Sequence, residues 1–187
     1  QPRSTVAESY DFILQDIDEA IASAPATNTT WYASQWTAKA LKARVLMNRG
    51  ATGDYAQVIT LTNDIIQNGG FELEENAADI FSAQGLDSKE IILGIKPLPN
   101  QVSKSDTYFY YGPAYIPTEA LITLLNGDPR ESWMLGDVQE GGTGIIKYKG
   151  PKIEESYFFR LTEMYLLQSE AIVRSGGNIT KTKKLLK

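Results

Sequence analysis

Five aromatic side chains crowd the stretch "DTYFYYGPAYIP" (residues 106–117), and these residues are the best suited to hold a ligand. They are Tyr108, Phe109, Tyr110, Tyr111 and Tyr115. A sugar ring has apolar C–H faces and polar edges, so flat aromatic rings beside hydroxyl and amide groups can bind it. The rings follow no helical or strand period, and a Gly-Pro pair marks an irregular segment. We expect two or three of the four tyrosines to face solvent, while packing against the helices or a partner protein remains the alternative.

Three tryptophans raise the same question. Trp31, together with Tyr32, lies beside a turn rich in Asn and Thr, where ligand contact and helix packing are both open. Trp36 begins a helix whose Ala and Leu positions are expected to be buried, so we expect Trp36 in the core as well. Trp133 follows "GDPRES", in which pairing of Asp128 with Arg130 would brace a loop.

The composition excludes much other chemistry. The chain has no Cys and no His, so it can form no disulfide, zinc-thiolate site, thiol nucleophile or Ser-His-Asp triad. Its formal charge of −5 disfavours phosphate backbones, and we expect no nucleic acid partner. The basic tail "KTKKLLK" is interpreted as the polar face of a helix.

Carboxylates could cleave a glycosidic bond only as a pair about 5 to 9.5 Å apart. The doublets Glu74-Glu75 and Glu154-Glu155 do not indicate such a pair, because neighbouring residues usually point in different directions. The "DIDE" sequence at 16–19 lacks the order of a calcium loop, and Asn126 with Asp128 offers only a weak oxygen-ligand pattern. We therefore predict no catalytic residue, no metal and no cofactor.

The length of 187 residues suffices for one well-filled core, so we expect one unit. No apolar run approaches the roughly 20 residues that span a bilayer. The chain begins without Met or a signal-peptide pattern, which suggests that any targeting segment lies upstream and that the sequence is a fragment.

Helical periodicity predicts three helices in the first part of the chain. They cover residues 6–24, residues 34–50 and residues 54–67. Either Ser4 or Thr5 can cap the first of them, and Glu8 would complete a capping box with Thr5. The turn "GATG" between the last two is so short that they must pack antiparallel, and the small Ala40 and Ala43 allow close approach.

The middle of the chain, residues 71–157, is predicted to be rich in loops. "KEIILGIK" (89–96) and "GIIKYK" (144–149) are typical of strands, and "PTEALITLLNGD" (117–128) of a short helix with Pro117 in its first turn. Helical periodicity returns over 158–177 and again in "ITKTKKLLK" (179–187).

Sliding the sequence by 126 residues aligns Gly50 with Gly176 and Ala43 with Ser169, which suggests related helical hairpins. The prediction is a mainly α fold: tetratricopeptide-like helical hairpins with an inserted loop-rich segment containing short strands. The helical part covers 1–70, the insertion 71–157 and an incomplete second hairpin 158–187. Two independent helix pairs remain the alternative.

Four stretches that span most of the chain carry a resemblance to a known family. They are "PRSTVAESYDFILQDIDEAI", "WTAKALKARVLMNRG" with the following "GDYAQVITLTNDIIQNGGFEL", "SKEIILGI", and "YFFRLTEMYLLQSEAIVRSGG". In sequence and in order they resemble the SusD/RagB-like nutrient-binding lipoproteins of Gram-negative outer membranes. The lysine-rich final segment departs from the Ala-rich helix that is usual there.

The resemblance implies a portion of a larger SusD-like domain, held at the extracellular face of the outer membrane through an upstream lipid anchor. It also implies non-catalytic capture of a glycan or oligosaccharide, which a partner SusC-like TonB-dependent transporter takes up. The family has no fixed ligand residues, so the glycan candidates rest on aromatic chemistry: Tyr108, Tyr110, Tyr111, Tyr115, Trp31 and Tyr32. A helical-repeat scaffold for proteins and a carboxylate-type glycoside hydrolase remain alternative functions.

Overall fold

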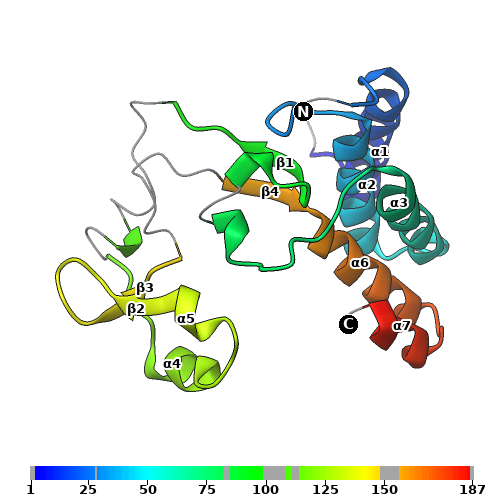
Figure 1. Ribbon diagram of the computed structural model, residues 1–187. Coiled ribbons are helices and arrows are strands. Elements are labelled where there is room, and N and C mark those ends of the chain that lie inside the picture. The colour runs from blue at the N-terminus through cyan, green and yellow to red at the C-terminus, as the bar shows by residue number, and fades with distance from the viewer. Residues whose placement is uncertain are drawn as a thin grey trace. The chain divides into compact units, whose positions relative to one another are not determined.

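The computed structural model describes residues 3–27, 29–81, 85–98, 108–110, 114–147 and 156–185 (Figure 1). The chain divides into two compact units. We call them the helical unit (Gln1–Leu73, Lys89–Gly94 and Tyr157–Lys187) and the excursion unit (Glu74–Ser88 and Ile95–Ser156). None of the helices in the described ranges combines the length and apolar character needed to cross a bilayer.

The first two helices begin and end where local chemistry directs. Helix α1 (Val6–Ser23) starts at the capping box of Thr5 and Glu8, which confirms the prediction. Helix α2 (Gln35–Arg49) starts at Ser34, whose side chain accepts a hydrogen bond from the amide of Thr37. It ends at Gly50, whose φ of 62° lies in the left-handed region that favours glycine.

The remaining helices of this unit extend one stack. Helix α3 (Asp54–Asn68) packs on α2, helix α6 (Leu161–Arg174) packs on α3, and helix α7 (Ile179–Leu185) packs on α6. Figure 1 shows α6, far along the chain, beside α3. Helices from the two ends of the chain therefore form one stack, and the relation between the two hairpins that the 126-residue slide suggests stays a prediction.

Two clusters of buried side chains hold the stack together. One comprises Ala40, Ile65, Ile92, Phe159, Leu161 and Met164, and the other Ala43, Leu46, Val58 and Ala171. Ala40 and Ala43 have no exposed surface, which confirms the expected close approach at α2. Their small side chains let larger residues of the neighbouring helices fill the space between the helix axes.

Strands β1 (Ile91–Ile95) and β4 (Ser156–Arg160) form a two-stranded sheet. The predicted helix over residues 158–160 is therefore wrong. Phe159 is 1% exposed and its neighbour Phe158 is 49% exposed, which is the alternation of a strand. Beyond the strands, the amide of Leu161 donates to the carbonyl oxygen of Glu90 at 2.9 Å.

The excursion unit contains short elements. They are the 3₁₀ turns η1 (Asp79–Phe81) and η2 (Gly85–Asp87), helices α4 (Glu119–Leu125) and α5 (Glu131–Met134), and strands β2 (Leu135–Asp137) and β3 (Thr143–Ile145). Strands β2 and β3 pair antiparallel, with Gly136 opposite Gly144.

Two boundaries in this unit differ from the prediction. The strand expected at 144–149 begins one residue earlier and ends at Ile145, and residues 148–149 lie outside the described residues. Pro117 precedes the helix instead of lying in its first turn, because the Thr118 side chain accepts from the amide of Leu121 and so caps α4. Helix α5 and strand β2 were not predicted, because both are too short to show a period.

Arg44 of α2 connects three elements of the helical unit. Its Nε and Nη2 atoms donate to the two carboxylate oxygens of Glu163 in α6, both at 2.7 Å. Nη2 also donates to the carbonyl oxygen of Phe158 in β4 at 2.9 Å, and the guanidinium carbon lies 4.0 Å from the centre of the Phe159 ring. Only a planar, forked cation can make a bidentate pair and stack on a ring simultaneously.

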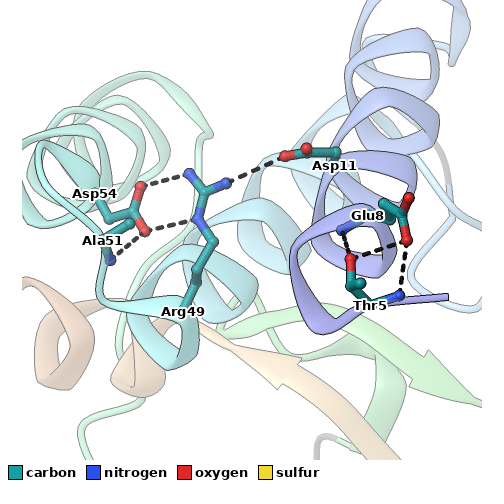
Figure 2. A network of polar contacts seen from close by, with 6 residues as sticks. All are labelled: Thr5, Glu8, Asp11, Arg49, Ala51 and Asp54. Atoms are coloured by element: carbon teal, nitrogen blue, oxygen red, sulfur yellow. Dashed lines mark hydrogen bonds and ion pairs between the residues drawn. The ribbon is translucent and has the colours of Figure 1, made fainter.

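Arg49 and Asp54 close the turn between α2 and α3 (Figure 2). The guanidinium donates to both oxygens of Asp54, at 2.7 and 2.9 Å, and the amide of Ala51 adds a third hydrogen bond at 2.8 Å. Asp54 is fully buried, and Arg49 also lies 3.9 Å from Asp11 of α1. The hydrogen bonds from Arg49, and to a lesser extent the one from Ala51, lower the pKa of Asp54 despite its burial.

Replacing Arg44 by lysine keeps the charge but removes the second donor, the bond to β4 and the stacking. We expect Arg44→Lys to lower the free energy of unfolding by about 2 kcal/mol, measured by urea unfolding. Arg174→Lys is the matched control, because Arg174 is about half exposed, pairs with Glu170 within α6 and lies 5.9 Å from the centre of the Tyr55 ring. Its replacement should cost less than about 0.5 kcal/mol. Equal stability of the two variants would contradict the role of Arg44.

Asp54→Asn should destabilise the protein at neutral pH by about 2 kcal/mol, because Arg49 loses its buried anion. The folded state lowers the pKa of Asp54 from its usual value of 3.8, so the unfolded state takes up this proton more readily. The stabilisation from Asp54 is therefore complete above that value and lost as the pH falls below it. Urea unfolding at pH 7 and pH 3 should show the difference between wild type and variant shrinking at the lower pH, and a constant difference would contradict this account.

Candidate functional site

Three rings of the excursion unit form a group that we call the aromatic ledge: Tyr108, Phe109 and Tyr115. The rings of Tyr108 and Tyr115 have centroids 5.6 Å apart and are inclined by 39°, and Phe109 meets Tyr108 edge-on at 6.2 Å. The backbone joins them as well, because the amide of Tyr115 donates to the carbonyl oxygen of Tyr108 at 3.1 Å. Residues seven positions apart are thereby held as neighbours.

The two principal rings of the ledge are open to solvent. Tyr108 is 42% exposed and Tyr115 is 60% exposed, whereas Tyr110 is half-buried and Tyr111 lies outside the described residues. The expectation that two or three of these tyrosines face solvent is confirmed by the first pair. Their contact with a ligand stays a prediction.

The hairpin of β2 and β3 is joined to the ledge segment by a backbone hydrogen bond. The amide of Gln139, just after β2, donates to the carbonyl oxygen of Tyr110 at 3.2 Å. The turn that follows reverses through Gly141 and Gly142, both with φ near 90°, where glycine is favoured. This support was not predicted, because a backbone hydrogen bond across 29 residues leaves no mark in the side-chain pattern.

The ledge is suited to stacking rather than to bond cleavage. Each exposed tyrosine offers an apolar face and a hydroxyl that can both donate and accept a hydrogen bond. The inclination of the two rings prevents both from lying flat on one planar surface, so they present two facets to a ligand. Exposed Ile116 follows directly and extends the apolar surface along the chain.

Trp31 and Tyr32 form a separate aromatic pair in the helical unit, with ring centroids 6.4 Å apart. Tyr32 is 60% exposed, while Trp31 is half-buried. Their turn is tied to β1, because the amide of Gly94 donates to the carbonyl oxygen of Thr30 at 2.7 Å. Tyr32 is thus available to a ligand, and Trp31 offers only part of its ring.

The other two tryptophans are structural. Trp36 packs against the first core cluster, as expected. Trp133 stacks on Phe81 with centroids 5.6 Å apart, an unpredicted pairing, and the Lys147 ammonium lies 4.0 Å from the centre of the Phe81 ring.

The expected pair of Asp128 and Arg130 is present. The guanidinium donates to both carboxylate oxygens at 2.8 Å and lowers the pKa of Asp128 to about 2. The backbone amide of Arg130 adds a third bond to the same carboxylate. The pair therefore braces the turn that leads into α5.

The polar groups of the described residues form no other site. Glu74 accepts a hydrogen bond from the Ser88 hydroxyl, and Glu154 and Glu155 lie outside the described ranges. No group of three Asp or Glu within those ranges is placed to hold a metal ion. A hollow of about 290 Å³ is lined by Lys42 and residues of α3, but it contains no aromatic ring.

Stacked helical hairpins that bear a loop-rich excursion define a tetratricopeptide-like scaffold. No protein-family model matches the chain. A curated SusD-like protein of Bacteroides ovatus is 24% identical over 107 residues, a match that covers 53% of this chain and 20% of that protein.

Solved structures show the same fold over nearly the whole chain. A SusD superfamily protein from Bacteroides thetaiotaomicron has a TM-score of 0.73 at 21% identity and covers 98% of this chain and 46% of that chain. A laminarin-binding SusD-like protein has a TM-score of 0.76 at 20% identity, with 98% and 53% covered. The chain has the SusD fold, which confirms the resemblance, and it spans about half the length of these two solved relatives.

Gly144 tests how the hairpin supports the ledge. A Cβ atom at this position would lie 2.2 Å from Cγ1 of Val138, next to the Gln139 amide that holds Tyr110. We expect Gly144→Ala to accelerate amide hydrogen exchange in β2 and β3 at least about tenfold, measured by mass spectrometry. Adding Val138→Ala should restore part of the protection, with Val138→Ala alone as the control. Unchanged exchange in the Gly144→Ala variant would contradict the close contact.

Proposed function

We propose that the protein binds glycan at the aromatic ledge and does not cleave it. The observation that carries this proposal is the pair of solvent-exposed rings, Tyr108 and Tyr115, held 5.6 Å apart on a braced loop. Exposed rings that lie together offer an apolar surface that a ligand can cover, and sugars present the apolar faces that fit. Tyr32, with the accessible part of Trp31, is a second contact candidate in the helical unit.

The SusD fold supports placing this binding at the cell surface. We infer that the protein acts at the extracellular face of the outer membrane and delivers its ligand to a SusC-like TonB-dependent transporter. We further propose that the 187 residues are a portion of a larger SusD-like domain. The SusD-like relative named for laminarin binding supports a glycan as the ligand class.

Two other functions are distinguished by direct assays. A glycan array separates glycan binding from a protein-binding scaffold, because a scaffold leaves the array empty. Release of reducing sugar over several hours separates binding from hydrolysis. We expect binding without release.

Removal of the exposed rings should weaken glycan binding while leaving the fold intact. We expect Tyr108→Ala and Tyr115→Ala each to lower affinity about tenfold in calorimetric titrations with the best array ligand, because each removes a stacking face. The corresponding Phe variants should keep most of the affinity if stacking dominates over the hydroxyl.

Phe12→Ala is the matched control, because Phe12 is an aromatic residue of α1 that is 66% exposed and lies outside the ledge. It should bind glycan as the wild type does. Wild-type affinity in both Tyr→Ala variants would remove the ledge from the binding site.

A further inference from the structure

The charge of the protein is distributed unevenly between its two units. The excursion unit contains twelve Asp and Glu against six Lys and Arg, a formal charge of −6. The helical unit contains eleven against twelve, a formal charge of +1, which together with −6 gives the −5 of the whole chain. The unit that bears the aromatic ledge is therefore the acidic one.

No Lys or Arg occurs from Ser105 to Pro129, so the nearest basic residues in the sequence are Lys104, four positions before Tyr108, and Arg130. The next cation along the chain, Arg130, is already bound to both carboxylate oxygens of Asp128. The Lys147 ammonium lies 4.0 Å from the centre of the Phe81 ring and 6.0 Å from that of Trp133. Arg130 and Lys147, two of the three described cations of this unit, are thus engaged with partners of their own.

Exposed carboxylates lie on the segments that form and support the ledge. Glu119 begins α4 two residues after Pro117, Asp137 ends β2, and Glu140 follows the Gln139 whose amide holds Tyr110. An ionised carboxylate only accepts hydrogen bonds, so it can bind the hydroxyl groups of a sugar. The same group repels a uronate, sialate or sulfate.

From this distribution we infer that the ledge selects uncharged glycans and rejects glycans that carry carboxylate or sulfate groups. The inference rests on the proposed glycan binding and names the ligand class of that same site. Stacking supplies attraction that is indifferent to charge, whereas the acidic surroundings disfavour an anionic chain of the same shape. The expected discrimination is at least about tenfold in affinity, because like charges brought together at a binding surface are destabilising.

The test uses pairs of glycans in which one member carries a charged group that the other lacks. Methyl-esterified and de-esterified oligogalacturonides of equal length form one pair, asialo and sialylated oligosaccharides a second, and desulfated and sulfated polysaccharide fragments a third. The array identifies which pairs bind, and calorimetry measures both members. Raising NaCl from about 50 to 500 mM should leave the neutral member unchanged and strengthen binding of the acidic member, because salt screens repulsion.

A charge-reversed variant locates the effect. Glu119→Lys combined with Glu140→Lys should reduce the preference for the neutral member at least about threefold. Asp16→Lys combined with Glu19→Lys is the matched control, because it changes the net charge equally on exposed residues of α1 in the helical unit. The control should keep the wild-type preference.

The outcomes separate this inference from the proposed function. Binding of neutral members with weaker binding of their acidic counterparts supports both. Equal or stronger binding of the acidic members overturns the charge selection while glycan binding stands. An array without any bound glycan overturns the proposed function and the inference together.

Discussion

The contact of Arg44 with Glu163 is the interaction on which the helical unit most depends. This contact joins α2 to α6, and its two residues lie 119 positions apart in the chain. The Arg44 guanidinium also donates to the carbonyl oxygen of Phe158 in β4. Hydrophobic packing brings the helices together and restricts how they cross, and a bidentate pair adds a directional constraint on their orientation. With Arg44 in place, Phe159 is sealed beneath the guanidinium and α6 can take its position on α3.

The ends of the excursion are fixed within the helical unit by backbone pairing. The first excursion leaves after Leu73 and returns at Lys89, where the amide of Glu72 donates to the Lys89 carbonyl oxygen at 3.3 Å and the side chains form an ion pair at 3.0 Å. The second leaves through β1 and returns through its partner strand β4. Loops tethered at both ends lose less entropy when they order, and binding residues are commonly found on such loops.

The sequence predicted the features that local physics determines. Capping at Thr5, termination at Gly50 and the periodicity of α1 to α3 all follow from neighbouring residues, and the structure agrees. The strand at Phe158 to Arg160 was missed because only Arg160 separates its apolar residues from those of α6, so only pairing with β1 reveals it. Exposure of Tyr108 and Tyr115 could be expected from the irregular segment, but the Gln139 support and the Phe81–Trp133 stack required coordinates.

The chain leaves the helical unit through β1 and re-enters it through β4, and this pairing determines which part of the protein can be exchanged. Because β1 and β4 already lie side by side, the chain between them can change in length or composition without requiring the stack to fold differently. The helical unit can thus carry different inserted segments, provided that each segment begins and ends at adjacent strands. Recognition of a new molecule could then be transplanted onto this scaffold by exchanging the segment between Ile95 and Ser156, while the helices keep their sequence.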